Sequence, residues 1–253
     1  MLGAIQVENV SKVFSRERVE LEALRDVSVD IQPGQFVAFV GPSGCGKSTL
    51  LKLIGGLLEP SSGRITIGSA PVKGPSRGIG VMFQTPVLFP WRTVLENVML
   101  PIEVFGLERA AASEKARGIL RLVGLDGREG AYPRELSGGM QQRAALSRVL
   151  ITDPPIILMD EPFGALDEFT RERMNLELLR IWSERGQTII FVTHSINEAV
   201  FLSDRIVVMD TLPGRVLAVV DVPLARPRSI EVMKSPEFAK TAFEVREYLG
   251  VAR

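Results

Sequence analysis

The sequence is nearly free of cysteine: Cys45 is the single one among 253 residues. An internal disulfide framework is therefore excluded, which agrees with a protein of a reducing compartment. No run approaches the roughly 18 consecutive apolar residues of a membrane-spanning helix. The opening MLGAIQVENV has no basic start, and Glu8 interrupts its apolar character, so it does not predict a signal peptide. We expect a cytoplasmic protein whose role at a membrane is at most peripheral.

The chain also lacks a net charge, because 30 Lys and Arg residues balance 30 Asp and Glu residues. Without a basic excess or a block of like charge, nothing indicates a nucleic-acid partner or a charged tail. Hydrophobic residues make up 45% of the chain, which is long enough for one large globular domain or two lobes.

Short apolar runs predict strands, and most are unbroken, as in a sheet covered on both faces. FVAFV at 36–40 leads straight into glycines, whereas residues 27–31 alternate apolar and polar side chains. The other predicted strands are 64–67, 79–83, 155–160, 188–193, 205–210 and 215–222.

Between residues 93 and 150 the pattern becomes helical. Thr93 and Glu96 have the spacing of a capping box, and further helices are predicted near 113–123 and 138–150. We therefore expect an α/β core interrupted by a helical insert. Three prolines after about residue 223 predict a loop followed by a terminal helix.

GPSGCGKST at 41–49 has the spacing of a phosphate-binding loop, between a predicted buried strand and an apolar helix. Lys47 can neutralise β and γ oxygens, and the Ser48 hydroxyl can ligate Mg²⁺. A glycine-rich turn before a core helix would leave the Lys-Ser pair unexplained. Cys45 lies near a helix start, so we expect its alkylation to block nucleotide binding. The expected nucleotide ligands here are Gly41, Pro42, Ser43, Gly44, Cys45, Gly46, Lys47, Ser48 and Thr49.

The run PIILMDEP ends a predicted buried strand with Asp160 and Glu161. Successive side chains of a strand point in opposite directions, so we expect the two carboxylates to have different roles. Asp160 is the candidate Mg²⁺ partner, and Glu161 is then free to orient and activate the attacking water. The alternative is an acidic pair that caps a loop, which the presence of a phosphate loop disfavours.

The stretch ELSGGMQQRAALSRVL at 135–150 offers a second helix start suited to an anion, with Ser137, Gly138 and Gly139 at its beginning. LSGGMQQR resembles the signature motif of ATP-binding cassette (ABC) ATPases, and it lies between the phosphate loop and Asp160, as in that family. The resemblance covers roughly residues 5–222.

The resemblance implies an α/β P-loop NTPase fold of the ABC-ATPase type. It has a RecA-like core, an antiparallel β subdomain and an inserted helical subdomain. We expect one ABC ATPase domain over 1–253: a core and β subdomain at 5–87 and 151–222, a helical subdomain at 88–150 and an extension at 223–253. ATP and Mg²⁺ are the implied ligands. Family members pair head to tail, so Ser137, Gly138, Gly139 and Gln141 would face the ATP held by the partner.

Smaller motifs follow from the same resemblance. Gln84 resembles the Q-loop glutamine near Mg²⁺ and the water, Asp167 in GALD the D-loop aspartate, and His194 the switch histidine. A lone histidine can instead have a purely structural role. Here, however, the capping-box spacing of Ser195–Glu198 predicts a helix start directly after His194, which would place the imidazole near a phosphate. Phe14 stands where the family stacks an aromatic on adenine; otherwise it is a core residue. The catalytic set is thus Glu161, His194, Gln84 and Lys47, and the metal set is Ser48, Gln84 and Asp160.

The sequence at 85–99 and 131–172 is most similar to those of the ATPases of nitrate, sulfonate and taurine importers. This implies an ATPase subunit that drives uptake of a small anionic solute through a separate permease at the cytoplasmic face of the membrane. An extracytoplasmic solute-binding protein would be an indirect partner. A second ATPase subunit, either an identical copy, as in a homodimer, or a different cassette, would be a direct one. The alternative is a soluble ABC ATPase whose dimerisation is itself the output.

The cluster Leu88, Phe89, Pro90 and Trp91 follows Gln84 and combines apolar and aromatic side chains. Exposed, it would form a docking site for a permease helix. Alternatively, Trp91 packs into the core of the helical insert. The sequence leaves the two interpretations evenly balanced.

Overall fold

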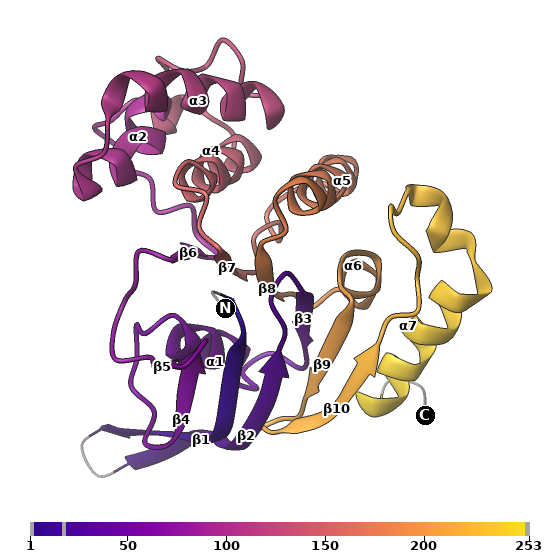
Figure 1. The fold of residues 1–253 in the computed structure, drawn as a ribbon. Helices are drawn as coiled ribbons and strands as arrows, with labels where there is room; N and C mark the ends of the chain where they lie inside the picture. The colour runs from indigo at the N-terminus through magenta and orange to yellow at the C-terminus, as the bar shows by residue number, and fades with distance from the viewer. Residues whose placement is uncertain (1–2, 17–18, 251–253) are drawn as a thin grey trace.

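A six-stranded sheet with the order β10-β9-β3-β8-β7-β6 forms the centre of the fold (Figure 1). The computed structural model describes residues 3–16 and 19–250. The pairs β3–β8, β3–β9, β8–β7 and β7–β6 are parallel, and β10 is antiparallel to β9. The strands are β3 (Phe36–Val40), β6 (Ile79–Met82), β7 (Ile156–Asp160), β8 (Thr188–Val192), β9 (Arg205–Met209) and β10 (Val216–Asp221).

Both faces of this sheet are buried, which explains the unbroken apolar runs. Along β3, Phe36, Ala38 and Val40 belong to one hydrophobic core, and Val37 and Phe39 to the other. The strand period of two thus distributes one run between two cores. The strand predictions for 36–40, 64–67, 79–83, 155–160, 188–193, 205–210 and 215–222 are confirmed within one or two residues at their ends.

A four-stranded antiparallel sheet with the order β2-β1-β4-β5 covers one of these cores, together with helix α1 (Lys47–Ile54). Its strands are β1 (Ile5–Arg16), β2 (Val19–Ile31), β4 (Ser62–Ile67) and β5 (Ala70–Pro71). The sequence pattern did not predict β1, and it found only the last part of β2 at 27–31. Register shifts interrupt the pairing of β1 with β2, so the alternation of apolar residues is broken there.

Helices α2 (Val94–Phe105), α3 (Arg109–Leu122) and α4 (Gly138–Leu150) pack on one another and lie together, away from the antiparallel sheet (Figure 1). The capping box at Thr93 and Glu96 is confirmed. Helix α3 begins four residues before its predicted start, because the Glu108 carboxylate accepts hydrogen bonds from the first free N–H groups. The helical insert is thus present, with α4 at its predicted bounds.

The remaining helices are α5 (Glu168–Arg185), α6 (Ile196–Leu202) and α7 (Pro236–Tyr248), with 3₁₀ turns η1 (Pro133–Glu135) and η2 (Ile230–Lys234). The terminal helix is confirmed as α7. The second capping-box spacing forms only its first half: Ser195 accepts a hydrogen bond from the Glu198 N–H, but the Glu198 carboxylate accepts one from Thr193 instead.

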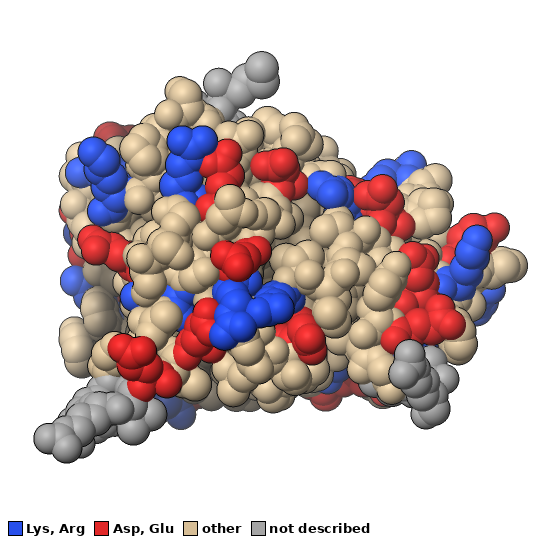
Figure 2. All heavy atoms as spheres, turned by 90° about the horizontal axis from the view of Figure 1, so that it is seen from below, with Lys and Arg blue, Asp and Glu red and all other residues tan. Residues whose placement is uncertain are grey.

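On the face drawn in Figure 2, basic and acidic side chains are interleaved with uncharged ones.

Within residues 3–16 and 19–250, no helix has both the length and the apolar character that crossing a bilayer requires.

Arg228 fastens the C-terminal segment to the rest of the fold. Its guanidinium is buried and donates hydrogen bonds to the carbonyl oxygens of Val200, Phe201 and Ser203 at the end of α6, and to that of Leu224. Burial lowers the pKa of Arg228 to about 10. The cation thus stands at the negative end of the α6 dipole and satisfies free carbonyl groups there.

Arg228→Ala is expected to lower the free energy of unfolding by about 1–3 kcal/mol, because buried carbonyl groups lose their donor. Urea unfolding followed by circular dichroism measures the change. Arg117→Ala, at an exposed position of α3, is the matched control and should stay within about 0.5 kcal/mol of the original chain. Equal stability of the two variants would contradict this role of Arg228.

Candidate nucleotide-binding site

The predicted phosphate loop, residues 41–49, connects β3 to α1 and packs closely against the carbonyl oxygen of Met209. Gly46 caps α1 with a left-handed backbone, φ 93°. A Cβ atom added at Gly41 would lie 2.6 Å from the carbonyl oxygen of Met209 and 2.8 Å from the Cys45 sulfur. Both positions therefore require glycine, one for its dihedral angle and one for space.

Lys47 and Cys45 lie inside this loop. The Lys47 ammonium donates hydrogen bonds to the carbonyl oxygens of Gly41, at 2.8 Å, and Pro42, at 2.9 Å. The Cys45 thiol is fully buried. An alkylating reagent therefore reaches it only when the loop opens, a condition that the sequence did not indicate. That alkylation blocks nucleotide binding stays a prediction.

Ser48 and Asp160 bring two oxygen donors together. The Ser48 hydroxyl donates to the Asp160 carboxylate at 2.8 Å. Burial raises the pKa of Asp160, and the charge of Glu161 adds to the rise, while the hydrogen bond from Ser48 opposes it. Mg²⁺ prefers oxygen ligands and usually takes one or two from the protein and the rest from phosphates and water. These two side chains fit that pattern, and the described residues hold no cluster of three or more His, Cys, Asp or Glu that would enclose a metal.

Glu161 faces a different set of partners from Asp160. Its carboxylate accepts a hydrogen bond from the Gln84 amide at 3.1 Å and lies 3.5 Å from Nδ1 of His194. The expected cause of this division was strand alternation, and that was wrong: β7 ends at Asp160, and Glu161 has a left-handed backbone with φ 46°. The chain turns at Glu161 and thereby separates the two carboxylates.

Gln84 was expected near both the metal and the attacking water; its amide lies beside Glu161, and its place in the metal set stays a prediction. Among the hydrogen bonds of residues 3–16 and 19–250, none joins Gln84 to Ser48 or Asp160. The groups at the ends of β3, β8, β7 and β6 nevertheless gather at one edge, because these four strands are consecutive and parallel. Ligands of such sheets bind at that edge.

The second candidate site begins α4. The Ser137 hydroxyl accepts a hydrogen bond from the Met140 N–H at 3.3 Å and so caps the helix. A Cβ atom at Gly139 would lie 2.8 Å from Cδ2 of Leu166, so the helix start packs against the segment before Asp167. The Gln141 amide donates to the carbonyl oxygens of Pro133 and Leu136, which braces the approach to the helix. In the described part of the chain, no hydrogen bond joins 137–139 to the phosphate loop.

Two further side chains of α4 hold the segment after β6. Buried Gln142 donates to the carbonyl oxygen of Gln84 at 2.5 Å, and Arg148 donates to those of Pro86 and Val87. Neither role was predicted for these residues. For Gln142, the polar residues that follow Gly138 and Gly139 could have indicated this contact, because a glutamine buried on a helix needs a hydrogen-bond partner.

Asp167 and Phe14 complete the predicted set. Asp167 caps α5 by accepting a hydrogen bond from the Thr170 N–H at 3.0 Å, and this bonding lowers the pKa of its carboxyl group. Phe14 lies on β1, is 39% exposed and has the Lys12 ammonium 5.2 Å from its ring centre. The core alternative for Phe14 is therefore excluded, and the stacking of its ring on adenine stays a prediction.

Comparison with known families identifies the architecture. Residues 24–164, more than half of the chain, match the family model described as "ABC transporter". The chain belongs to the ABC transporter family. It is an ABC-type ATPase, and the fold expected from its motifs is confirmed by solved cassettes.

One solved structure, the ATP-binding cassette MJ0796 in a dimeric post-hydrolysis state bound to ADP and Pi, is 34% identical with a TM-score of 0.78. The matched region covers 87% of this ABC ATPase and 100% of the MJ0796 chain. The aliphatic sulfonates import ATP-binding protein SsuB of Bacillus cereus is 42% identical over 247 residues, 98% of this chain and 97% of the relative. The taurine import ATP-binding protein TauB of Rhizobium johnstonii is 45% identical over 253 residues, 97% and 96% of the two chains.

Gly214 supports the phosphate loop of this ABC ATPase, although no sequence pattern indicated it. Its N–H donates to the carbonyl oxygen of Ala23, and its carbonyl accepts from the Arg25 N–H. A Cβ atom there would collide with the carbonyl oxygen of Cys45 and lie 3.0 Å from that of Ala23. The turn before β10 thus touches the loop backbone from below, a contact that only glycine allows.

Gly214→Ala is expected to weaken nucleotide binding at least fivefold, roughly 1 kcal/mol, because the added methyl group displaces the Cys45 peptide. Isothermal titration with ADP measures the affinity. Gly130→Ala, where an added Cβ would meet nothing within 4 Å, serves as the control and should leave the affinity unchanged. Equal affinities for both variants would show that the loop does not depend on this contact.

Proposed function

We propose that the chain is the ATP-hydrolysing subunit of an ABC importer and couples ATP binding and hydrolysis to uptake of a small anionic solute. The observation that carries the proposal is the gathering of Ser48, Asp160, Glu161, Gln84 and His194 at one sheet edge, next to the phosphate loop. The relatives named as import proteins for aliphatic sulfonates and taurine support the solute class, to which we add nitrate.

We assign the roles in hydrolysis from the contacts at this edge. Ser48 and Asp160 would hold Mg²⁺, which when bound neutralises charge developing on the phosphate oxygens. When ATP binds, the Lys47 ammonium would leave the carbonyl groups of the loop and donate to β and γ oxygens of ATP. Glu161 accepts the proton of the attacking water as the general base, since its carboxylate contacts two further polar side chains of the site, Gln84 and His194.

The arrangement of Ser137 and Gly139 supports a head-to-tail pair. The helix start that they form offers N–H groups and a dipole suited to a γ-phosphate, yet it makes no hydrogen bond to the phosphate loop within the described residues. In a pair of identical copies, each helix start completes the site of the other, and Asp167 lies in the segment between them. We further propose that residues 5–87 and 151–222 form the core, 88–150 the helical lobe and 223–253 an extension.

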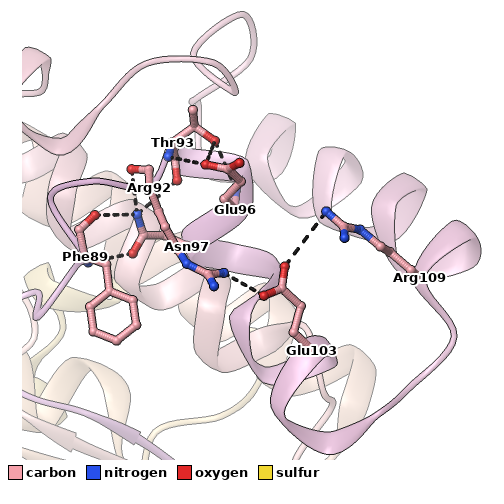
Figure 3. Close-up of polar contacts among 7 residues, drawn as sticks. All are labelled: Phe89, Arg92, Thr93, Glu96, Asn97, Glu103 and Arg109. Carbon is pink, nitrogen blue, oxygen red and sulfur yellow. Dashed lines mark hydrogen bonds and ion pairs between the residues drawn. The ribbon is translucent and has the colours of Figure 1, made fainter.

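Phe89 and Trp91 form a surface suited to a membrane permease. Trp91 is 70% exposed and stacks on Phe89 with ring centres 5.0 Å apart, so it does not pack into the helical core. Buried Asn97 holds the loop below them: its side chain accepts from the Phe89 N–H and donates to the carbonyl oxygens of Phe89, Arg92 and Thr93 (Figure 3). The two rings are therefore presented by a rigid loop.

This loop is also joined directly to the hydrolysis site. Arg148 holds the carbonyl groups of Pro86 and Val87, and Gln142 holds that of Gln84. A permease that pushes on Trp91 would thus act on Gln84 and, through it, on Glu161. The subunit would be peripheral, at the cytoplasmic face of the membrane, and would meet a solute-binding protein only indirectly.

Glu161→Gln is expected to lower the rate of phosphate release by roughly 10²- to 10⁴-fold, the usual contribution of a general base, while ATP still binds. Because ATP is then not consumed, light scattering should detect an ATP-dependent dimer. Adding Ser137→Arg to this variant should abolish the dimer but not ATP binding. Normal turnover in Glu161→Gln would contradict the assignment of the base.

Trp91→Ala is expected to change the ATPase rate of the isolated chain by no more than about twofold. Stimulation of that rate by the permease should be lost, because a docking surface binds its partner less tightly when its main aromatic side chain is removed. Phe243→Ala removes a similarly exposed ring from α7 and is the control. Unchanged solute uptake in Trp91→Ala vesicles would exclude this docking surface.

A further inference from the structure

The turn that carries His194 is held from inside the protein by a buried pair of side chains. The Thr193 hydroxyl donates to Oε2 of Glu198 at 2.5 Å and accepts from the Ser195 N–H at 3.0 Å. Thr193 is 2% and Glu198 8% exposed, whereas the His194 side chain is 62% exposed. The backbone on both sides of the imidazole is therefore fixed by groups that solvent does not reach.

The position of Glu198 is not explained by capping of α6. Ser195 supplies the cap, and its own N–H is taken by the Thr193 hydroxyl rather than by the Glu198 carboxylate. Burial raises the pKa of Glu198, and the bond from Thr193 opposes the rise, with smaller contributions from Asn175, Arg171 and the His194 side chain. Burying a carboxyl group is costly. The hydrogen bond from Thr193, rather than a helix cap, is what this buried carboxylate provides.

The same group of side chains reaches the segment between Glu161 and Asp167. Arg171 donates to the carbonyl oxygen of Leu166 at 3.0 Å. A small cavity of about 10 Å³ is lined by Glu161, Arg171, His194 and Glu198, among others. Glu198 therefore lines the same cavity as Glu161, the proposed general base, and His194, which we also propose to act in hydrolysis.

We propose that Glu198 is a positioning residue that, through the Thr193 hydroxyl, orients the His194 imidazole toward Glu161. The inference rests on the proposed role of His194 in hydrolysis. Its chain of contacts is short: Glu198 fixes Thr193, Thr193 fixes the Ser195 N–H, and the peptide between them carries the imidazole, 3.5 Å from the Glu161 carboxylate. The Thr193 N–H bonds to the Phe39 carbonyl oxygen, so the turn is also tied to β3.

The first test uses the single histidine of the chain. In an untagged, full-length protein, one imidazole signal in a ¹H–¹³C spectrum reports His194 without ambiguity. Thr193→Val and Glu198→Ala are expected to shift and broaden this signal, while Thr193→Ser and Glu198→Gln, which keep a hydroxyl group or an acceptor in place, restore it. Thr241→Val removes an equally buried hydroxyl group from α7 and should not move the signal.

The second test separates positioning from loss of fold. In steady-state ATPase assays, Thr193→Val and Glu198→Ala are expected to lower kcat roughly 10- to 100-fold, the scale of a misplaced catalytic group, with KM for ATP within about twofold. Thr193→Ser and Glu198→Gln should recover most of kcat. An imidazole signal and a kcat equal to those of Thr241→Val in both variants would overturn the inference.

His194→Ala distinguishes this inference from the function on which it rests. If His194→Ala keeps full turnover, the proposed role of His194 fails, and a moved imidazole signal in Thr193→Val would still support the positioning contact. If His194→Ala loses turnover but Thr193→Val and Glu198→Ala do not, the role of His194 stands and the positioning role of Glu198 is wrong.

Discussion

Parallel hydrogen bonding among β3, β8, β7 and β6 is the constraint on which the rest of the molecule depends. It places the ends of four strands, far apart in the sequence, at one edge of the sheet. Each strand then contributes to the site at its end: the phosphate loop after β3, His194 after β8, Asp160 at the end of β7 with Glu161 just after it, and Gln84 just after β6. None of these groups lies in the interior of a strand, so their side chains vary without cost to the sheet.

The contacts around this edge form one connected network rather than separate motifs. Gly139 packs against Leu166, and Gln142 bonds to the peptide of Gln84. On the other side, Arg171 bonds to the carbonyl oxygen of Leu166. A displacement of α4 therefore acts on two segments near Glu161: the one that contains Leu166 and the one that contains Gln84. Such a network is able to transmit a change of state between helices and sheet, because packed interfaces move between discrete arrangements rather than deform continuously.

The sequence predicted the chemical groups better than the way they are held. Glycine, lysine and serine at fixed spacing specify a phosphate loop locally, so 41–49 was found without tertiary information. Strand β1 was missed because its bulges break the alternation of apolar residues. The backbone of Glu161 and the contact of Gly214 depend on neighbours distant in sequence, which no local pattern reports. Glu198 was predicted only as part of a capping box, and its bond with the Thr193 hydroxyl was not predicted.

The strand order also fixes when the protein can become active during its synthesis. The ribosome makes β3 and the predicted phosphate loop early, but the partners of β3 within residues 3–16 and 19–250 are β8 and β9, and β9 ends at Met209. Domains of this kind fold as units, and non-local pairing is slow. A nascent chain therefore carries a complete loop sequence without the paired strands of this sheet until residue 209 has been made. Until then, its apolar strands are unpaired, a state in which strands are prone to aggregate.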